Sequence, residues 1–136
     1  MDLIKSLKIA ASGLRAQSGR MRVVSENLAN VDSTADTPGG DPYRRQIPTF
    51  RTVLDRELGA HVVQPGRVRE DTSDFSIRYE PGHPAADAKG YVRTSNVNSL
   101  VEMMDMREAQ RSYEANLNII RSARTMIQRT LDILRA

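Results

Sequence analysis

The sequence predicts a mainly α fold with a small β and loop insert, in which two long terminal helices form a coiled-coil-like hairpin. Two observations predict this fold. Both ends of the 136-residue chain repeat apolar residues at alternating spacings of four and three, which is typical of helices that pack on one another. The middle is expected to hold turns and short strands, because Pro, Gly and polar residues are concentrated there. The chain therefore divides into residues 1–31, 32–98 and 99–136.

The first helix is predicted over residues 1–31, and its row of apolar residues is here called its seam. Asp2 lies near the start, where a carboxylate suits the positive end of the helix dipole. Gly13 and Gly19 either mark the close approach of another segment or are simply tolerated. Gln17 is the one polar residue of the seam, and such a residue often fixes register at some cost in stability. The seam residues that we expect to pack are Leu7, Leu14, Met21, Val24 and Leu28.

The insert over residues 32–98 has the composition of turns and short extended pieces. Pro48 limits any strand within residues 43–58 to an edge, or breaks it, because proline has no N–H to donate to a neighbouring strand. A half-buried strand is predicted where apolar and polar residues alternate, at Phe75, Ile77 and Tyr79.

The second helix is predicted over residues 99–136, a run without Gly or Pro. Ser99 with Glu102 three residues later fits a capping box, and Asn98 is the alternative cap. Arg124 occupies the one polar place in the seam of this helix and is a second candidate for fixing register. The apolar seam residues are Tyr113, Leu117, Ile120, Ile127, Leu131 and Leu134.

A second apolar row repeats every seven residues on a flanking face of this helix, at Ile119, Met126 and Ile133. One neighbouring helix would not cover both rows. We therefore expect the seam of the second helix to face the first helix of the same chain, and this flanking row to face neighbouring molecules.

The charge pattern argues against a nucleic-acid-binding protein. The formal net charge is +3 and the isoelectric point is about 9.6, but the three segments carry +3, −1 and +1. Binding through phosphates favours clustered Lys and Arg with aromatic residues for stacking. The best cluster is only the pair Arg44 and Arg45, so no nucleic-acid partner is expected.

No catalytic or metal-binding constellation stands out, and we expect no enzyme activity and no cofactor. The chain has no Cys, and His61 and His83 lack a second ligand at metal-binding spacing. The carboxylates of Glu102, Asp105 and Glu108 share one helical stripe, which we interpret as a solvated face.

The first residues do not resemble a secretory signal peptide, because Lys5 and Lys8 interrupt apolar residues that are spread at helical spacing. No apolar run approaches the ~20 residues that cross a bilayer, so direct membrane insertion is not expected. A protein of this kind that works outside the cytoplasm would be exported without a cleaved signal peptide.

Both ends of the chain resemble one known family. The N-terminal segment ASGLRAQSGRMRVVSENLANVDSTADTPGGDPYRRQ, and above all Asn27, Leu28, Ala29 and Asn30, resembles the signature of the bacterial flagellar basal-body rod proteins. The C-terminal segment GYVRTSNVNSLVEMMDMREAQRSYEANLNIIRSARTMIQRTLDIL is similar to the C-terminal helix of that family. The segments PGGDPYRRQ and YEPGHPAADAKGYV, with the short total length, resemble its proximal-rod members. The resemblance is weakest over Phe50–Ile77.

The resemblance implies a structural subunit that polymerises through its terminal helices into the tubular drive shaft that transmits torque across the periplasm. Its implied partners are copies of itself, other flagellar rod proteins and the flagellar type III export apparatus. The alternative interpretation of the heptad faces is a cytosolic helical adaptor or scaffold that binds one partner through them.

Overall fold

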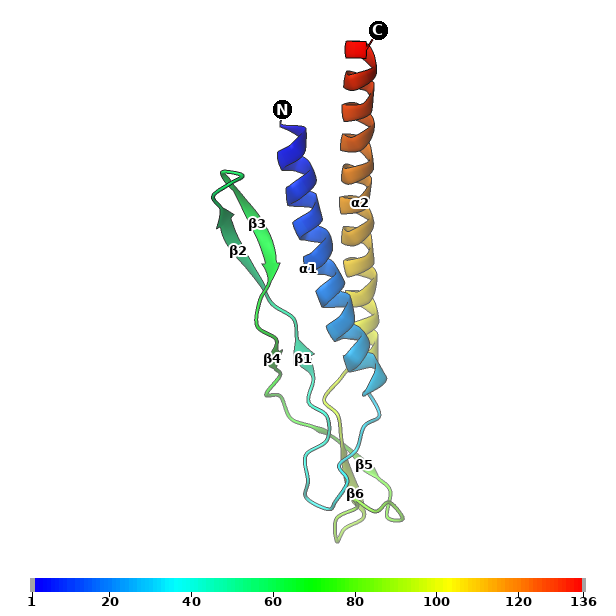
Figure 1. Cartoon of the computed structure of the whole chain (residues 1–136). Coiled ribbons are helices and arrows are strands. Elements are labelled where there is room, and N and C mark those ends of the chain that lie inside the picture. The colour runs from blue at the N-terminus through cyan, green and yellow to red at the C-terminus, as the bar shows by residue number, and fades with distance from the viewer. Residues whose placement is uncertain (1, 136) are drawn as a thin grey trace. The chain divides into compact units, whose positions relative to one another are not determined.

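The computed structural model describes residues 2–135, which form two terminal helices with a strand-containing segment between them (Figure 1). This arrangement confirms the predicted architecture at the level of its elements. In chain order the elements are α1 (Leu3–Ala29), β1 (Gln46–Ile47), β2 (Phe50–Asp55), β3 (Ala60–Pro65), β4 (Arg69–Glu70), β5 (Ser76–Tyr79), β6 (Tyr91–Thr94) and α2 (Ser99–Arg135).

Both helices begin at a capping side chain. The Asp2 carboxylate accepts the backbone N–H groups of Ile4 and Lys5, each at 3.1 Å, and so caps α1. The Asn98 side chain accepts the N–H groups of Leu100 and Val101 at 3.0 and 3.3 Å, and so caps α2. Of the two caps considered for α2, Asn98 is therefore the one that forms.

The strands pair as three antiparallel two-stranded ribbons: β1 with β4, β2 with β3, and β5 with β6. The longest is the β2–β3 hairpin, in which Phe50 pairs with Pro65 and Asp55 pairs with Ala60. Gly59 in its turn has a φ of +58°, which favours glycine. Pro48 lies between β1 and β2, as expected for a residue that interrupts a strand.

The prediction of a half-buried strand near Phe75 is wrong in its burial. Strand β5 forms, but Ile77 is 67 % exposed and Tyr79 is 62 % exposed. Phe75 lies just before the strand and is half-buried, with the Arg44 guanidinium 4.2 Å from its ring centre. Alternation alone overstated the burial because β5 pairs with a single strand and belongs to no larger sheet within the described chain.

The chain folds as two compact units, which we describe separately. The first unit contains α1 through Met21, Thr49–Arg67 with the β2–β3 hairpin, and α2 from Arg107 onward. The second unit contains Arg22–Pro48 and Val68–Met106. Each unit draws residues from all three segments of the sequence.

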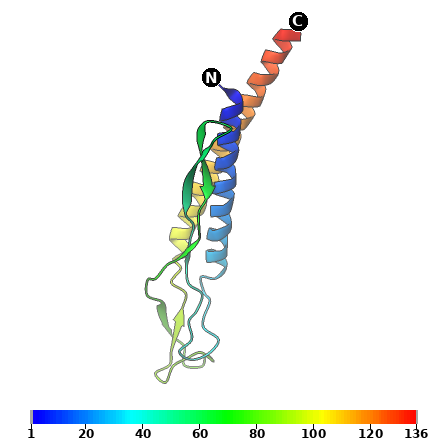
Figure 2. The same ribbon diagram turned by 60° about the vertical axis from the view of Figure 1, so that its left-hand side comes forward.

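In the first unit α1 packs against both α2 and the hairpin. Figure 2 shows the β2–β3 hairpin running beside the N-terminal half of α1. On that face of α1, the Ser12 hydroxyl accepts the backbone N–H of Val63 at 3.3 Å, and Ala16 is buried one turn further along. Facing α2, a Cβ on Gly13 would lie 2.8 Å from the side-chain amide nitrogen of Asn116, so this glycine marks a close approach.

In the second unit one apolar cluster consists of Ala35, Ala85 and Val92, with Ala86 packed against it. Val23 and Val24 of α1 are buried in this unit as well. Polar interactions also join α1, the insert and α2 here.

Candidate assembly surface

Asn27 is the centre of a buried polar network in the second unit. It lies near the end of α1 and is fully buried. Its side-chain oxygen accepts the backbone N–H of Gln46 at 2.9 Å and the Tyr43 hydroxyl at 2.8 Å. Its side-chain nitrogen donates to the carbonyl of Gln46 at 2.8 Å and to Glu102 at 3.0 Å. One amide therefore joins α1, β1 and α2.

Glu102 supplies the charge of this network. Its carboxylate is fully buried and accepts a hydrogen bond from the Arg45 Nε at 2.5 Å in addition to the one from Asn27. Arg45 also approaches Asp71 at 3.5 Å and Asp105 at 3.7 Å. A buried carboxylate is costly unless it is paired and hydrogen-bonded, and both conditions are met here.

The network sets the protonation preferences of its members. Partial burial lowers the pKa of Arg45, but the hydrogen bond and charge of Glu102, with those of Asp71, outweigh it and raise that pKa above its ordinary value. Hydrogen bonds from Ser73, and then the Arg45 guanidinium, hold the pKa of Asp71 below its usual 3.8. Burial, and then the negative charges of Glu26 and Glu102, raise the pKa of Tyr43. Each shift favours the charge state that the network uses.

The insert is tied to this network by its own polar groups. The Asn96 side chain accepts the backbone N–H of Arg45 at 2.7 Å and donates to the carbonyl of Asp71 at 3.1 Å. The Arg44 guanidinium donates to the carbonyls of Asp71 and Ser73 at 3.1 and 3.2 Å. The adjacent arginines that formed the best basic cluster of the sequence are thus both engaged within the chain.

Sequence reasoning missed this network. It placed Glu102 on a solvated face, and that interpretation is wrong because the side chain is directed to Asn27 and Arg45 rather than to water. A signal was present, because three residues spaced by seven from Glu102 also lie inward: Ala109 and Ala123 are buried and Asn116 is half-buried. This row of small and polar residues was not identified from the sequence, because only large apolar side chains were considered.

Asn27, Leu28, Ala29 and Asn30 are here called the Asn27 motif, and the last three have smaller roles than Asn27. The Asn30 side chain donates to the carbonyl of Glu26 at 2.8 Å and accepts the Ser33 hydroxyl at 3.0 Å, which closes the turn after α1. Leu28 is half-buried and Ala29 is exposed. The motif thus combines one interhelical residue with residues that end the helix.

The five seam residues of α1 are buried or half-buried. Val24 is buried, and Leu7, Leu14, Met21 and Leu28 are half-buried. Whether the exposed fractions of these side chains contact a neighbouring molecule stays a prediction.

The seam of α2 packs only in part. Tyr113, Leu117, Ile120 and Ile127 are half-buried, but Leu131 is 49 % exposed and Leu134 is 78 % exposed. The expectation that the last two face α1 is wrong, and the pairing of the helices explains why. Gly13 lies against Asn116, and Arg20 binds Glu108 at 3.1 Å. In this antiparallel register the first turn of α1 lies near residue 126, so the last turns of α2 extend past it.

The flanking row of α2 is exposed. Ile119, Met126 and Ile133 are 48, 45 and 76 % exposed. Large aliphatic side chains at regular spacing on one exposed helix face indicate a surface that another molecule covers. That a neighbour covers this row stays a prediction.

The two candidates for fixing register differ in environment. Gln17 is half-buried, and its side-chain oxygen is buried and accepts no hydrogen bond from any residue between 2 and 135. Arg124 is exposed beside a shallow groove formed by Leu7, Ala11 and Ile120. Their role in register stays a prediction.

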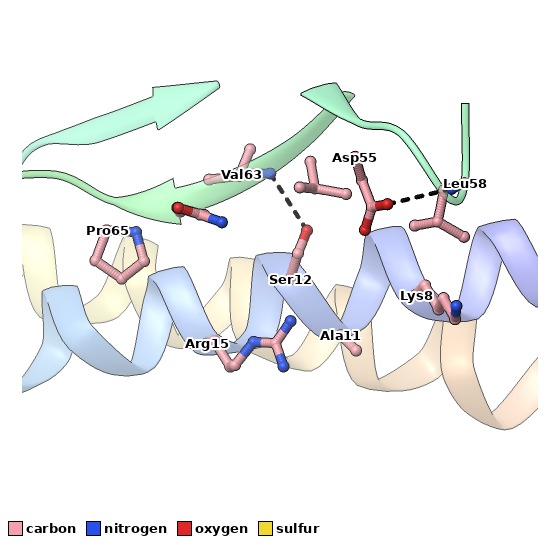
Figure 3. Close-up of a pocket in the computed structure, with 10 residues that line it drawn as sticks. Lys8, Ala11, Ser12, Arg15, Asp55, Leu58, Val63 and Pro65 are labelled. Atoms are coloured by element: carbon pink, nitrogen blue, oxygen red, sulfur yellow. Dashed lines mark hydrogen bonds between the residues drawn. The ribbon is translucent and has the colours of Figure 1, made fainter. Parts of the chain in front are cut away.

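A cationic groove of about 630 Å³ lies between α1 and the β2–β3 hairpin (Figure 3). Its helix wall carries Lys8 and Arg15, and its hairpin wall carries Asp55 and Leu58. Lys8 and Arg15 are exposed and form no ion pair with the described residues. The Asp55 carboxylate is occupied by the hairpin turn, where it accepts the backbone N–H of Leu58 at 3.2 Å. The groove therefore presents positive charge outward.

Comparison with known proteins shows to which family the chain belongs. Residues 7–39 match the family model described as flagella basal body rod protein, and residues 88–133 match the C-terminal model of flagellar basal body rod FlgEFG proteins. The flagellar basal-body rod protein FlgC of Agrobacterium fabrum is 54 % identical over 95 % of this chain and 93 % of its own length. The chain belongs to the FlgC family of flagellar basal-body rod proteins. FlgC of Bacillus subtilis and of Salmonella typhimurium are each 38 % identical over 98 % of this chain, and over 99 and 98 % of their own lengths.

Family membership decides between the functional alternatives. The chain is a structural subunit of the flagellar basal-body rod, not an enzyme, and assembles with other rod proteins in the basal body. The cytosolic adaptor is not favoured. Neither α1 nor α2, as far as residues 2–135 describe them, is apolar enough over sufficient length to cross a bilayer.

Proposed function

We propose that this subunit builds the proximal part of the rod by polymerising through α1 and α2 into a tubular shaft that transmits torque across the periplasm. Within each copy the two helices act as a coiled-coil-like hairpin. The observation that carries the proposal is the regular apolar surface that a single copy leaves exposed on α2, at Ile119, Met126, Leu131, Ile133 and Leu134.

This surface suits a shaft because it distributes load. Each large apolar side chain that becomes fully buried contributes roughly 1.5–3 kcal/mol, and such contacts repeat along the helix. The end of α2 is exposed on more than one side, since Ile133 and Leu134 are adjacent in sequence and both more than 75 % exposed. A helix end of this kind suits burial among several neighbours rather than in one dimer.

The Asn27 motif serves the shaft indirectly. Asn27 fixes the end of α1 to β1 and to α2 within one copy, at hydrogen-bond lengths of 2.8–3.0 Å. We infer that it sets the direction in which the insert leaves the helices, rather than touching a neighbour. Asn30 closes the following turn.

The test substitutes the exposed row. Met126→Ser combined with Ile133→Ser should leave the thermal unfolding of the purified chain nearly unchanged, because both side chains are exposed. The same variant should be lost from purified basal bodies, and cells that carry it should not swim. Gln128→Ser, an exposed residue of the same helix segment outside this row, is the matched control and should behave as wild type. Normal incorporation of the double variant would refute the proposal.

The register role of Gln17 and Arg124 has its own test. Gln17→Leu replaces a buried, unpaired oxygen and should stabilise the purified chain, yet impair motility if the polar side chain selects one register of assembly. Arg124→Leu should likewise spare folding, because Arg124 is exposed. If both variants assembled normally and motility was unchanged, the register role would be refuted.

We further propose that the flagellar type III apparatus exports the chain without cleaving a signal peptide. Support comes from family membership and from the packing of the first residues, since Ala10 and Ser12 of α1 are buried parts of the first unit. The intact mass of the subunit recovered from basal bodies should match a chain that still contains these residues. A mass lacking the first turns of α1 would exclude this route.

Assembly should also order the subunit. The last turns of α2 extend past α1 in a single copy, so they have no helical partner to hold them there. We expect circular dichroism to show less helix per residue for the monomer than for the assembled rod. Equal helicity would contradict this expectation.

A further inference from the structure

The two units of the chain have opposite charge. The first unit carries thirteen Lys and Arg against six Asp and Glu, a formal net charge of +7. The second unit carries seven against eleven, a formal net charge of −4. The contrast is hidden in the sequence, because each unit is assembled from separate segments.

Two cations of the first unit line a groove that a partner can reach. Lys8 and Arg15 lie seven residues apart on the exposed wall of the groove beside the hairpin, about 10 Å along the helix axis (Figure 3). Neither forms an ion pair with residues 2–135, and the two cations outnumber the one carboxylate of the groove lining, that of Asp55. Two such cations at a concave surface attract carboxylates.

The second unit offers carboxylates in the same condition. Asp36, Glu70 and Asp74 are exposed, and none of them forms an ion pair with the described residues. The carboxylates that hold this unit together, such as Glu102 and Asp71, are occupied by Arg45. The exposed carboxylates are therefore available to another molecule.

We propose that in the rod the first unit of one copy packs against the second unit of another copy, with Lys8 and Arg15 receiving carboxylates from the set Asp36, Glu70 and Asp74. The inference rests on the proposed polymerisation and adds which surfaces meet. This contact joins a unit with a formal net charge of +7 to a unit with a formal net charge of −4, so opposite charges meet. A contact between two different surfaces of the same chain is heterologous, and its repetition gives a helical polymer when the rotation between copies does not close into a ring.

A charge-reversal pair tests the contact between copies. In the first variant Lys8 and Arg15 are changed to Glu; in the second Asp36, Glu70 and Asp74 are changed to Lys. Each variant alone should enter basal bodies at least tenfold less than wild type and fail to support swimming. When both are expressed in one cell, the reversed groove of the first meets the reversed carboxylates of the second, and incorporation and swimming should return.

Either of two results would overturn the inference: wild-type swimming by one variant alone, or no recovery when both are present. If the groove served an unrelated polyanion, such as a nucleic acid or an anionic lipid surface, the second variant would swim normally because its Lys8 and Arg15 are intact. The charge-conserving variants Lys8→Arg with Arg15→Lys, and Asp36→Glu with Glu70→Asp and Asp74→Glu, are the matched controls and should swim.

Two further measurements keep the test decisive. Thermal unfolding of each purified variant should match wild type, because all five residues are exposed; if a reversal unfolds the chain, Lys8→Gln with Arg15→Gln replaces it and should reduce incorporation several-fold. Detection of the wild-type subunit in purified basal bodies tests the proposed function itself. If the wild-type subunit is present in basal bodies and the charge-reversal variants are incorporated equally well, only the inference about the contact is refuted.

Discussion

The two units satisfy their buried groups in different ways. In the second unit the fully buried Asn27 and Glu102 find hydrogen-bond partners within one copy. In the first unit Gln17 keeps a buried oxygen without a partner among residues 2–135, and Ile133 and Leu134 remain in water. The difference indicates that Asn27 and Glu102 of the second unit are satisfied within their own chain, whereas the first unit keeps a buried oxygen for which we propose a partner in a neighbouring molecule.

The largest expected effect comes from breaking the buried ion pair of the second unit. Glu102→Ala removes the carboxylate that Arg45 and Asn27 bind, and leaves the Arg45 guanidinium with its longer contacts to Asp71 and Asp105. Losing one partner of a buried pair costs about 3–5 kcal/mol, so the free energy of unfolding in urea should fall by that amount.

The first unit supplies the matched control for this variant. Glu108→Ala removes the carboxylate that binds Arg20, but the Glu108 side chain is 67 % exposed. An exposed pair contributes ~0–1 kcal/mol, so this variant should unfold almost as wild type does. Equal losses from both variants would contradict the contrast between the units.

A smaller effect is expected when the network loses its amide. Asn27→Ala leaves the Tyr43 hydroxyl and the backbone groups of Gln46 without their partner, which should cost about 1–3 kcal/mol. Asn30→Ala removes only bonds at the turn after α1 and should cost less. Urea unfolding of the two variants side by side measures the difference, and a larger loss for Asn30→Ala would show that the motif matters through its turn.

Gly13 and Gly19 of α1 differ in the space that surrounds them in the first unit. A Cβ on Gly19 would lie 3.7 Å from Pro65, so Gly19→Ala should stabilise α1 by up to ~1 kcal/mol. A Cβ on Gly13 would press on Asn116, whose side chain must then give up its 2.9 Å hydrogen bond to the Ser112 carbonyl. Gly13→Ala should therefore gain about 1 kcal/mol less than Gly19→Ala.

The double variant Gly13→Ala with Asn116→Ala tests the cause of that difference. Removing the Asn116 amide relieves the close contact, so the double variant should recover the stabilisation that Gly13→Ala lacks. The comparison is the thermal unfolding of wild type, Gly13→Ala, Asn116→Ala and the double variant. No recovery would mean that the backbone of α2, and not this side chain, sets the distance between the helices.

The smallest expected effect is a dependence on pH from the second unit. Hydrogen bonds from Ser73, and then the Arg45 guanidinium, lower the pKa of Asp71 in the folded chain. Because the folded pKa lies below the unfolded one, this contribution is complete above the usual 3.8 and is lost as pH falls through the folded value. Urea unfolding of Asp71→Asn should accordingly vary less with pH in that acidic range than unfolding of wild type.

The sequence by itself determined the elements that depend on short stretches of chain. The two terminal helices, the Asp2 cap, the interruption at Pro48 and the family signature around Asn27 all follow from residues close together in sequence. Local spacing suffices for these features, because helix periodicity and capping involve residues within about one turn of each other.

Only the tertiary structure decided what depends on residues far apart. Glu102 looked solvated until Asn27, 75 residues away, and Arg45 were placed beside it. The end of the α2 seam looked covered until the register showed that α1 stops short of Leu131. The charges of +7 and −4 arise because folding gathers separate segments of the chain into each unit. Burial and charge are properties of neighbours in space, so they become definite only when the chain is folded.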